Sequence, residues 1–213
     1  MVYAFKAAGA KADQLAPLEA VTAAAQKAAD ATRSIGVALA PCTLPAAGRP
    51  TFQIEEGAME IGMGIHGEPG VRRDKLKSAD EITGEMLDYL LGDISLHSGD
   101  RVSVLVNSLG ATPPEELYIV FRYVHQKLSA MGLSIVMPLV GRYATSMEMV
   151  GMSLSICHLD DELEQLITAR GQAGMKLQPE PRQHGEGLDI SGMLQQAVHH
   201  GLRCDHLSFG ENT

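Results

Sequence analysis

The stretch of residues 101–140 constrains the fold more than any other part of this sequence. Residues 101–107 are rich in valine and predict a buried strand, and residues 133–140 predict a second one. Between them, residues 112–115 (Thr-Pro-Pro-Glu) have the spacing of a capping box with proline in the first helical turn, and Gly132 stands where a helix stop belongs. A strand, a helix and a strand in this order predict a right-handed crossover and at least one parallel strand pair.

Other segments predict further helices and strands around this unit. Residues 78–81 (Ser-Ala-Asp-Glu) form a capping box that opens a second helix. The alanine-rich residues 16–33 predict a helix, and the apolar residues 35–40 and 151–159 predict strands. We therefore expect an α/β fold (α+β-like): a two-layer domain with a mixed, partly parallel sheet covered by helices.

The segment before the second helix is expected to be a hairpin that leads into a loop. Residues 51–55 and 58–63 are short extended segments on either side of Glu56-Gly57, which is a typical turn pair. The glycine-rich residues that follow predict a loop that runs on through Arg72, Arg73 and Asp74.

Composition predicts one sizeable domain and excludes several functions. The chain has 213 residues, of which 45% are hydrophobic, and its net charge is −9. This charge argues against nucleic-acid binding, and no apolar run reaches the roughly 18 residues of a membrane span. Three widely spaced cysteines and the absence of an apolar leader favour a cytoplasmic location. We expect a domain over residues 1–165 and a poorly patterned C-terminal extension or linker over residues 166–213.

The strongest functional signal is a histidine framed by four glycines, Gly62, Gly64, Gly67 and Gly70. Because glycine places no side chain between backbone and ligand, a small molecule can approach His66 closely. Its imidazole could then act as a base, a metal ligand or a nucleophile towards a carbonyl carbon. The alternative is a tight turn in which the ring caps a backbone carbonyl. Glu68 either orients the ring or is a solvated loop carboxylate.

Other candidate sites are weaker. The glycine run fits the pattern G-x-G-x-x-G, but no helix starts inside it, so a dinucleotide site is not expected. No phosphate-binding P-loop pattern occurs in the sequence. The tail residues His199, His200, Cys204 and His206 lack the paired spacing of zinc ligands, and we expect no metal site.

Several segments together resemble the substrate-binding subunit of dihydroxyacetone kinase. They occur in family order over roughly residues 2–162, and include G-I-H-G-E-P-G, N-S-L-G-A-T-P and G-R-Y-A-T-S-M-E-M. The segments are residues 31–39, 42–45, 59–70, 99–102, 107–113, 116–118 and 141–149.

The resemblance implies that His66 binds a ketose covalently, as a hemiaminal at the ketone carbon. Gly64, Gly67 and Glu68 are then the expected substrate-binding neighbours, and no metal is implied. It further implies that this chain binds no cofactor directly, because ATP or a phosphorylated carrier acts through a nucleotide-binding partner subunit or domain. The implied substrate is dihydroxyacetone or another short ketose, and a homo-oligomer is expected.

The resemblance covers only the second half of the family's substrate-binding subunit. The first half, with its G-G-G-S-G-H-E-P motif and an acidic residue implicated in proton transfer, has no counterpart here. We therefore expect a phosphotransferase that is incomplete as an isolated chain and needs a first-half chain. The alternative is a non-catalytic module that senses a ketose or binds a partner subunit.

Overall fold

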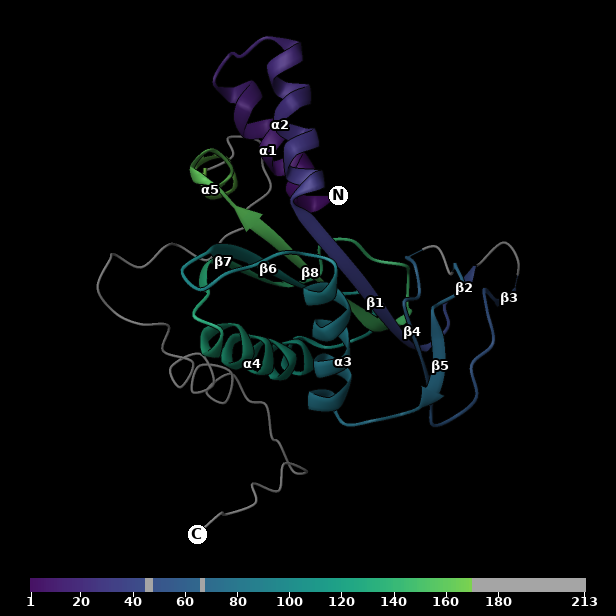
Figure 1. Ribbon diagram of the computed structural model, residues 1–213. Helices are drawn as coiled ribbons and strands as arrows, with labels where there is room; N and C mark the ends of the chain where they lie inside the picture. The colour runs from purple at the N-terminus through teal and green to yellow at the C-terminus, as the bar shows by residue number, and fades with distance from the viewer. Residues whose placement is uncertain (45–47, 66–67, 170–213) are drawn as a thin grey trace, which may run out of the picture. The chain divides into compact units, whose positions relative to one another are not determined.

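The computed structural model describes residues 1–44, 48–65 and 68–169, which belong to one compact unit (Figure 1). Its helices are α1 (Val2–Asp13), α2 (Leu18–Asp30), α3 (Ala79–Gly92), α4 (Pro114–Ala130) and α5 (Asp161–Thr168). Its longer strands are β1 (Thr32–Ala40), β6 (Arg101–Ser108), β7 (Ser134–Gly141) and β8 (Val150–Leu159). The short strands are β2 (Thr43–Leu44), β3 (Arg49–Pro50), β4 (Ala58–Ile61) and β5 (Arg72–Lys75).

Six of the strands form one mixed sheet in the order β5-β4-β1-β8-β6-β7. The pair β6 and β7 is parallel and is joined by α4, which confirms the predicted crossover unit. The other neighbouring strands of this sheet are antiparallel. The predicted mixed, partly parallel α/β fold is therefore confirmed.

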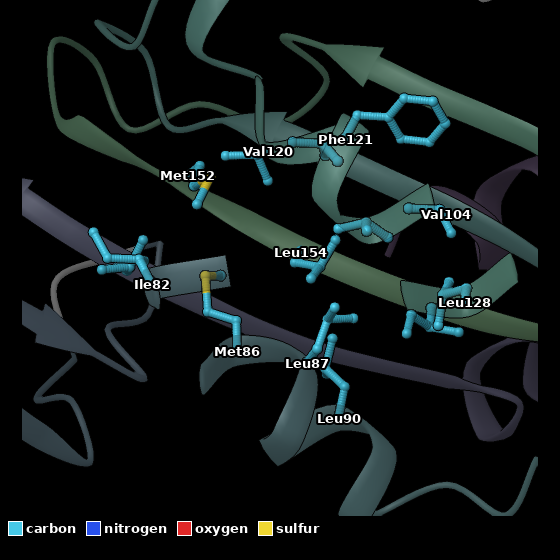
Figure 2. Close-up of a cluster of buried hydrophobic side chains, with 14 of the residues drawn as sticks. Ile82, Met86, Leu87, Leu90, Val104, Val120, Phe121, Leu128, Met152 and Leu154 are labelled. Atoms are coloured by element: carbon cyan, nitrogen blue, oxygen red, sulfur yellow. The ribbon is translucent and has the colours of Figure 1, made fainter. Parts of the chain in front are cut away.

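Helices α3 and α4 cover one face of the sheet and form the larger hydrophobic cluster (Figure 1). Figure 2 shows side chains of both helices around Leu154 of β8, which is fully buried. The helices contribute apolar residues at helical spacing and the strands contribute alternate residues, as expected for a helix layer on a sheet. This cluster joins the sheet to one layer of helices; the helices on the other face add a layer that the two-layer prediction did not include.

A second cluster lies on the other face, where α1, α2 and α5 group together (Figure 1). Alanines at positions 7, 24 and 28 let α1 and α2 pack closely, and Tyr3 is buried beneath them. The Tyr3 hydroxyl accepts a hydrogen bond of 3.0 Å from Ser103 of β6. Burial also raises the Tyr3 pKa, so this hydroxyl stays protonated.

One of the two predicted capping boxes is confirmed, and the other is wrong. The Ser78 side chain accepts from the backbone N–H of Glu81, and the Glu81 carboxylate accepts from that of Ser78, at the start of α3. In contrast, α4 has Pro113 at its N-cap and no side-chain cap. The Thr112 hydroxyl instead donates to the Gly151 carbonyl (2.7 Å) and accepts from its N–H (2.9 Å).

The predicted hairpin around Glu56-Gly57 is wrong. Residues 51–55 form no strand, and β4 pairs with β1 on one side and with β5 on the other. Strand β5 occupies residues that were predicted to be loop. Its four charged residues give no apolar alternation, and they lie at the edge of the sheet, where charged side chains reach solvent.

Two further differences concern the N-terminal helices and the tail. Helix α1 was not predicted, and the helix predicted for residues 16–33 begins at Leu18 and ends at Asp30. The predicted extension begins at residue 166, and its residues 170–213 lie outside the described residues. The division at residue 165 and its assignment to a second domain stay predictions. Among the described residues, no helix combines the length and apolarity needed to cross a membrane.

Candidate functional site

The glycine-rich loop begins where β4 ends, and backbone hydrogen bonds fix both of its ends. The Gly62 N–H donates to the carbonyl of Gly36 in β1 at 2.7 Å, and the Val71 N–H donates to the carbonyl of Ile61 at 2.7 Å. These bonds hold the first and last residues of the loop against the sheet. The sequence thus leaves the sheet at residue 62 and returns to it at residue 71.

The structure brings two of the four predicted site residues together inside this loop. The Gly64 N–H donates to the Glu68 carbonyl at 3.2 Å, and Glu68 is exposed. A Cβ added at Gly64 would overlap the Glu68 carboxylate, so that carboxylate lies over the Gly64 backbone. His66 and Gly67 lie outside the described residues.

The loop passes directly over β1 because residue 36 is glycine. Any Cβ at Gly36 would overlap the backbone carbonyl oxygen of Met63. Gly36 is buried in the middle of β1, where glycine is otherwise unfavourable in a strand. The close approach of the two backbones is the physical reason for a glycine at this position.

A small hydrophobic cluster includes residues of the glycine loop and packs against it. Its buried members are Ala38, Cys42, Met63, Leu109 and Met149, and the partly buried Phe52 and Ile65 pack against it. The cluster therefore connects the glycine loop to the segments that follow β6 and precede β8. Two further segments of the resemblance, around residues 107–113 and 141–149, meet the glycine loop at this cluster.

Asn107 at the end of β6 holds the second of these segments in place. Its side-chain oxygen accepts from the N–H groups of Tyr143 (2.8 Å) and Ala144 (2.9 Å). Its amide nitrogen donates to the Ala144 carbonyl (2.7 Å) and to the Ser153 hydroxyl (3.1 Å). A buried amide with four partners rigidifies the turn that leads from β7 towards β8.

Three titratable side chains near these loops are buried or partly buried: Tyr143, Cys42 and Glu60. Burial raises the pKa of Tyr143, so its phenol remains protonated at neutral pH. The Cys42 thiol is free and buried, 3.4 Å from the Thr51 hydroxyl and 3.5 Å from the Ser146 hydroxyl. The Glu60 carboxylate accepts from the Gly70 N–H (2.6 Å) and from Arg73 Nε (2.7 Å).

Sequence reasoning missed Glu60 and Asn107 as supporting residues of the site. Glu60 stands between the apolar Met59 and Ile61, a pattern that predicts a solvent-facing residue, yet it is only 3% exposed. Asn107 ends a valine-rich strand, and a polar residue there is a usual strand terminus. Burial of both side chains becomes visible only when distant segments are brought together.

No metal centre is found in the described part of the chain, where no three His, Cys, Asp or Glu side chains are grouped to bind an ion. The tail residues His199, His200, Cys204 and His206 lie outside the described residues. An apolar cavity of about 130 Å³ lies between β1, β8 and the first turns of α3 and α4. Its lining includes Val37, Ile82 and Met152, which belong to the larger cluster, on the face away from Gly36 and Met63.

Comparison with known families assigns the class of this protein. Residues 1–174 match the family described as "Dak1 domain". The chain therefore belongs to the Dak1 domain family. The resemblance to dihydroxyacetone kinase substrate-binding subunits is thereby confirmed at the level of the family.

Individual relatives carry kinase names. The dihydroxyacetone-binding subunit DhaK of PTS-dependent dihydroxyacetone kinase 2 from Listeria innocua is 47% identical over 163 residues, which cover 76% of this chain and 49% of the relative. The L-erythrulose kinase of Pectobacterium atrosepticum is 44% identical over 173 residues, covering 79% of this chain and 29% of the relative.

Two solved structures share the fold at 30% identity and a TM-score of 0.70. One is the dihydroxyacetone kinase of C. freundii in complex with AMP-PNP and Mg²⁺, with 79% of this chain and 31% of that chain covered. The other is the dihydroxyacetone kinase operon co-activator Dha-DhaQ, with 76% of this chain and 50% of that chain covered. The chain spans about half or less of the length of these relatives and structures.

Proposed function

We propose that this chain is the ketose-binding part of a dihydroxyacetone-type kinase, and that His66 binds the ketose covalently. The observation that carries the proposal is the G-I-H-G-E-P-G loop, which is fixed at both ends against the sheet and meets two further family-like segments. Relatives named as dihydroxyacetone-binding subunits and erythrulose kinases support a short ketose as the ligand.

The proposed capture is an addition of the imidazole N–H across the ketone. The unprotonated ring nitrogen of His66 attacks the carbonyl carbon and forms a C–N bond. The π electrons of the carbonyl move to its oxygen, which takes up a proton, while the other ring nitrogen gives up its proton. The product is a neutral hemiaminal, and no oxidant or reductant is needed.

Covalent capture explains how a very small substrate can be selected. A three- or four-carbon ketose offers few atoms for hydrogen bonds, so hydrogen bonding distinguishes it poorly from other polyols. Glycerol has no electrophilic carbon and cannot form the adduct. A glycine-framed ring leaves room for the carbonyl to approach, and Gly64, Gly67 and Glu68 are proposed to line that approach.

Phosphoryl transfer is proposed to need further chains. Transfer to a hydroxyl requires a positioning group and neutralisation of the moving phosphoryl, and this part of the molecule is proposed to supply neither. We place the phosphate source, ATP or a phosphorylated carrier, on a nucleotide-binding partner. We also propose that the chain corresponds to the second half of a longer substrate-binding subunit, that a first-half chain or a second copy completes the site, and that it acts in the cytoplasm.

Nuclear magnetic resonance with dihydroxyacetone labelled with carbon-13 at its carbonyl tests the capture. On adding the protein, we expect part of the label to leave the ketone region and appear as a tetrahedral carbon. Native mass spectrometry of the intact chain should show the added mass of one ketose. His66→Ala should abolish both signals, whereas His97→Ala, at a side chain that is 82% exposed on a distant loop, should leave them unchanged. Absence of the adduct with and without a first-half chain would refute the proposal.

A second candidate is a non-catalytic module that binds a ketose or a partner subunit without turnover. A solved structure named as an operon co-activator supports this second candidate. Its fold is as similar to this chain as that of the kinase, with the same identity and TM-score. A phosphorylation assay with a nucleotide-bearing partner separates the two. Turnover supports the kinase component, whereas adduct or complex formation without turnover supports the module.

A further inference from the structure

Glu60 is a buried carboxylate directly beneath the glycine loop. It lies in β4 between Met59 and Ile61, which point into the larger cluster, so its side chain points to the opposite face of the sheet. It is 3% exposed. Burying a carboxylate costs free energy unless hydrogen-bond donors pair with its oxygens, so the donors around Glu60 are decisive for its role.

Each oxygen of this carboxylate has its own donor; Gly70 lies at the end of the loop and Arg73 lies after it, in β5. Oε1 accepts from the backbone N–H of Gly70 at 2.6 Å, and Oε2 accepts from Nε of Arg73 at 2.7 Å. Arg73 stands directly opposite Glu60 in the antiparallel pair of β4 and β5. The carboxylate suits this site because both partners are donors and each approaches a different oxygen.

The backbone at Gly70 also rests on the Glu60 side chain. A Cβ at Gly70 would lie 2.7 Å from Glu60 Cγ, closer than ordinary van der Waals contact. The chain leaves β4 immediately after Ile61 and returns at Val71. The Glu60 side chain therefore ties β4 to the end of the loop and to β5, in addition to the backbone bonds.

We infer that Glu60 is a positioning residue whose two hydrogen bonds set the geometry in which the glycine loop captures a ketose. This inference rests on the proposed function. An apolar residue at position 60 could be buried without the cost of burying a charge, but it would leave the Gly70 N–H without its acceptor. Glu60 touches no reacting atom in this proposal; it acts through Gly70 and Arg73.

The test compares Glu60→Gln with the double variant Glu60→Gln/Arg73→Gln in the full chain. The two donors approach different oxygens of Glu60, and in glutamine an NH₂ group replaces one of these oxygens, so one of the two donors would face another donor. In the double variant the amide of residue 60 can accept from Gly70 and donate to the new amide at residue 73. The matched control is Glu85→Gln. This variant removes a carboxylate of α3 that pairs with Arg72 at a distance of 2.6 Å and lies outside the loop.

The readouts are ketose capture, followed by the carbonyl label, and hydrogen exchange of the peptide that contains Gly70. We expect Glu60→Gln to weaken capture by about tenfold or more and to speed exchange at this peptide, as small displacements of a reacting group do. The double variant should recover most of the loss, and Glu85→Gln should match the unmodified chain. Arg73→Gln alone, at an exposed side chain, should give a smaller loss and serves if Glu60→Gln does not fold.

The results separate this inference from the proposal beneath it. Normal capture by the unmodified chain and equal capture by Glu60→Gln would overturn the inference and leave the proposed function standing. Equal losses in the single and double variants would also overturn it, because they would indicate general damage in place of lost complementarity. No capture by the unmodified chain, either alone or with a first-half chain, would overturn both.

Discussion

The close approach of Met63 to Gly36 gives a sharp test of how the loop is held. Replacing Gly36 with alanine places a methyl group where the Met63 carbonyl oxygen lies, and both are backbone-anchored. Either the loop moves away from β1 or the strand bends. The 2.7 Å hydrogen bond from the Gly62 N–H to the Gly36 carbonyl lies beside this contact and would be strained in either case.

The expected cost is a net of two opposing effects. Forcing an extra methyl group into a packed site costs about 1–3 kcal/mol. Replacing glycine also restricts the unfolded chain, which stabilises the fold by about 0.4–1 kcal/mol. We therefore expect Gly36→Ala to lower the free energy of unfolding by about 1–2 kcal/mol, and the melting temperature by about 2–8 °C for a chain of this size.

Gly9→Ala is the matched control, because it adds the same methyl group to a site with no heavy atom within 4 Å. Gly9 lies in the exposed face of α1, where alanine favours a helix over glycine by about 0.5–1 kcal/mol. Thermal unfolding followed by circular dichroism should thus give shifts of opposite sign. A Gly36→Ala chain as stable as the unmodified one, with unchanged hydrogen exchange in the loop, would refute the close approach as the cause.

Two further predictions concern a helix start and the response to acid. Ser78→Ala removes the cap of α3 and should lower the free energy of unfolding in urea by about 1 kcal/mol; an unchanged value would contradict the reciprocal cap. Hydrogen bonds from Lys27 and Lys11 lower the pKa of Glu162, so the stability that this carboxylate contributes is present above its unfolded pKa of about 4.3 and is lost as the pH falls through the folded value. Lys27→Gln should therefore reduce the loss of stability between about pH 5 and pH 3, measured by urea unfolding, and an unaltered pH profile would count against this pairing.

The elements that could be predicted are those whose signal is local. The valine run of β6 and the reciprocal cap at Ser78 depend on neighbours within a few residues, and both are confirmed. The stop after α4 is likewise local, since the helix ends at Ala130, two residues before Gly132. Hydrophobic periodicity and capping residues indicate these features, and both can be recognised without knowing which distant residues lie nearby in the fold.

The elements that were missed depend on tertiary partners. Strand β5 carries four charged residues and is a strand only because β4 lies beside it. Helix α1 is rich in alanine and packs on α2 and α5, and only Tyr3 and Ala7 are buried, so its apolar face is too small to recognise from the sequence alone. Thr112 has the right spacing for a cap, yet the backbone of Gly151 in another strand competes for its hydroxyl.

The candidate site divides in the same way. The glycine loop is recognisable because four glycines around one histidine are a local pattern. Its supports are not local: Gly36 is 26 positions before Gly62, and Asn107 holds a turn 36 and 37 positions away. Only the folded chain shows that Gly36 contacts the glycine loop and that Asn107 holds the turn after β7.

Strand β5 has a consequence for how copies of this chain behave in concentrated solution. Its outer edge carries no neighbouring strand in the described residues, and such an edge invites another chain to add itself. The edge strand β5 carries the charged residues Arg72, Arg73 and Lys75. Arg72 forms an ion pair with Glu85, and Arg73 forms one with Glu60. A second β5 aligned in parallel and in register would place Arg72, Arg73, Asp74 and Lys75 opposite their own copies, so like charges oppose edge-to-edge pairing of this kind.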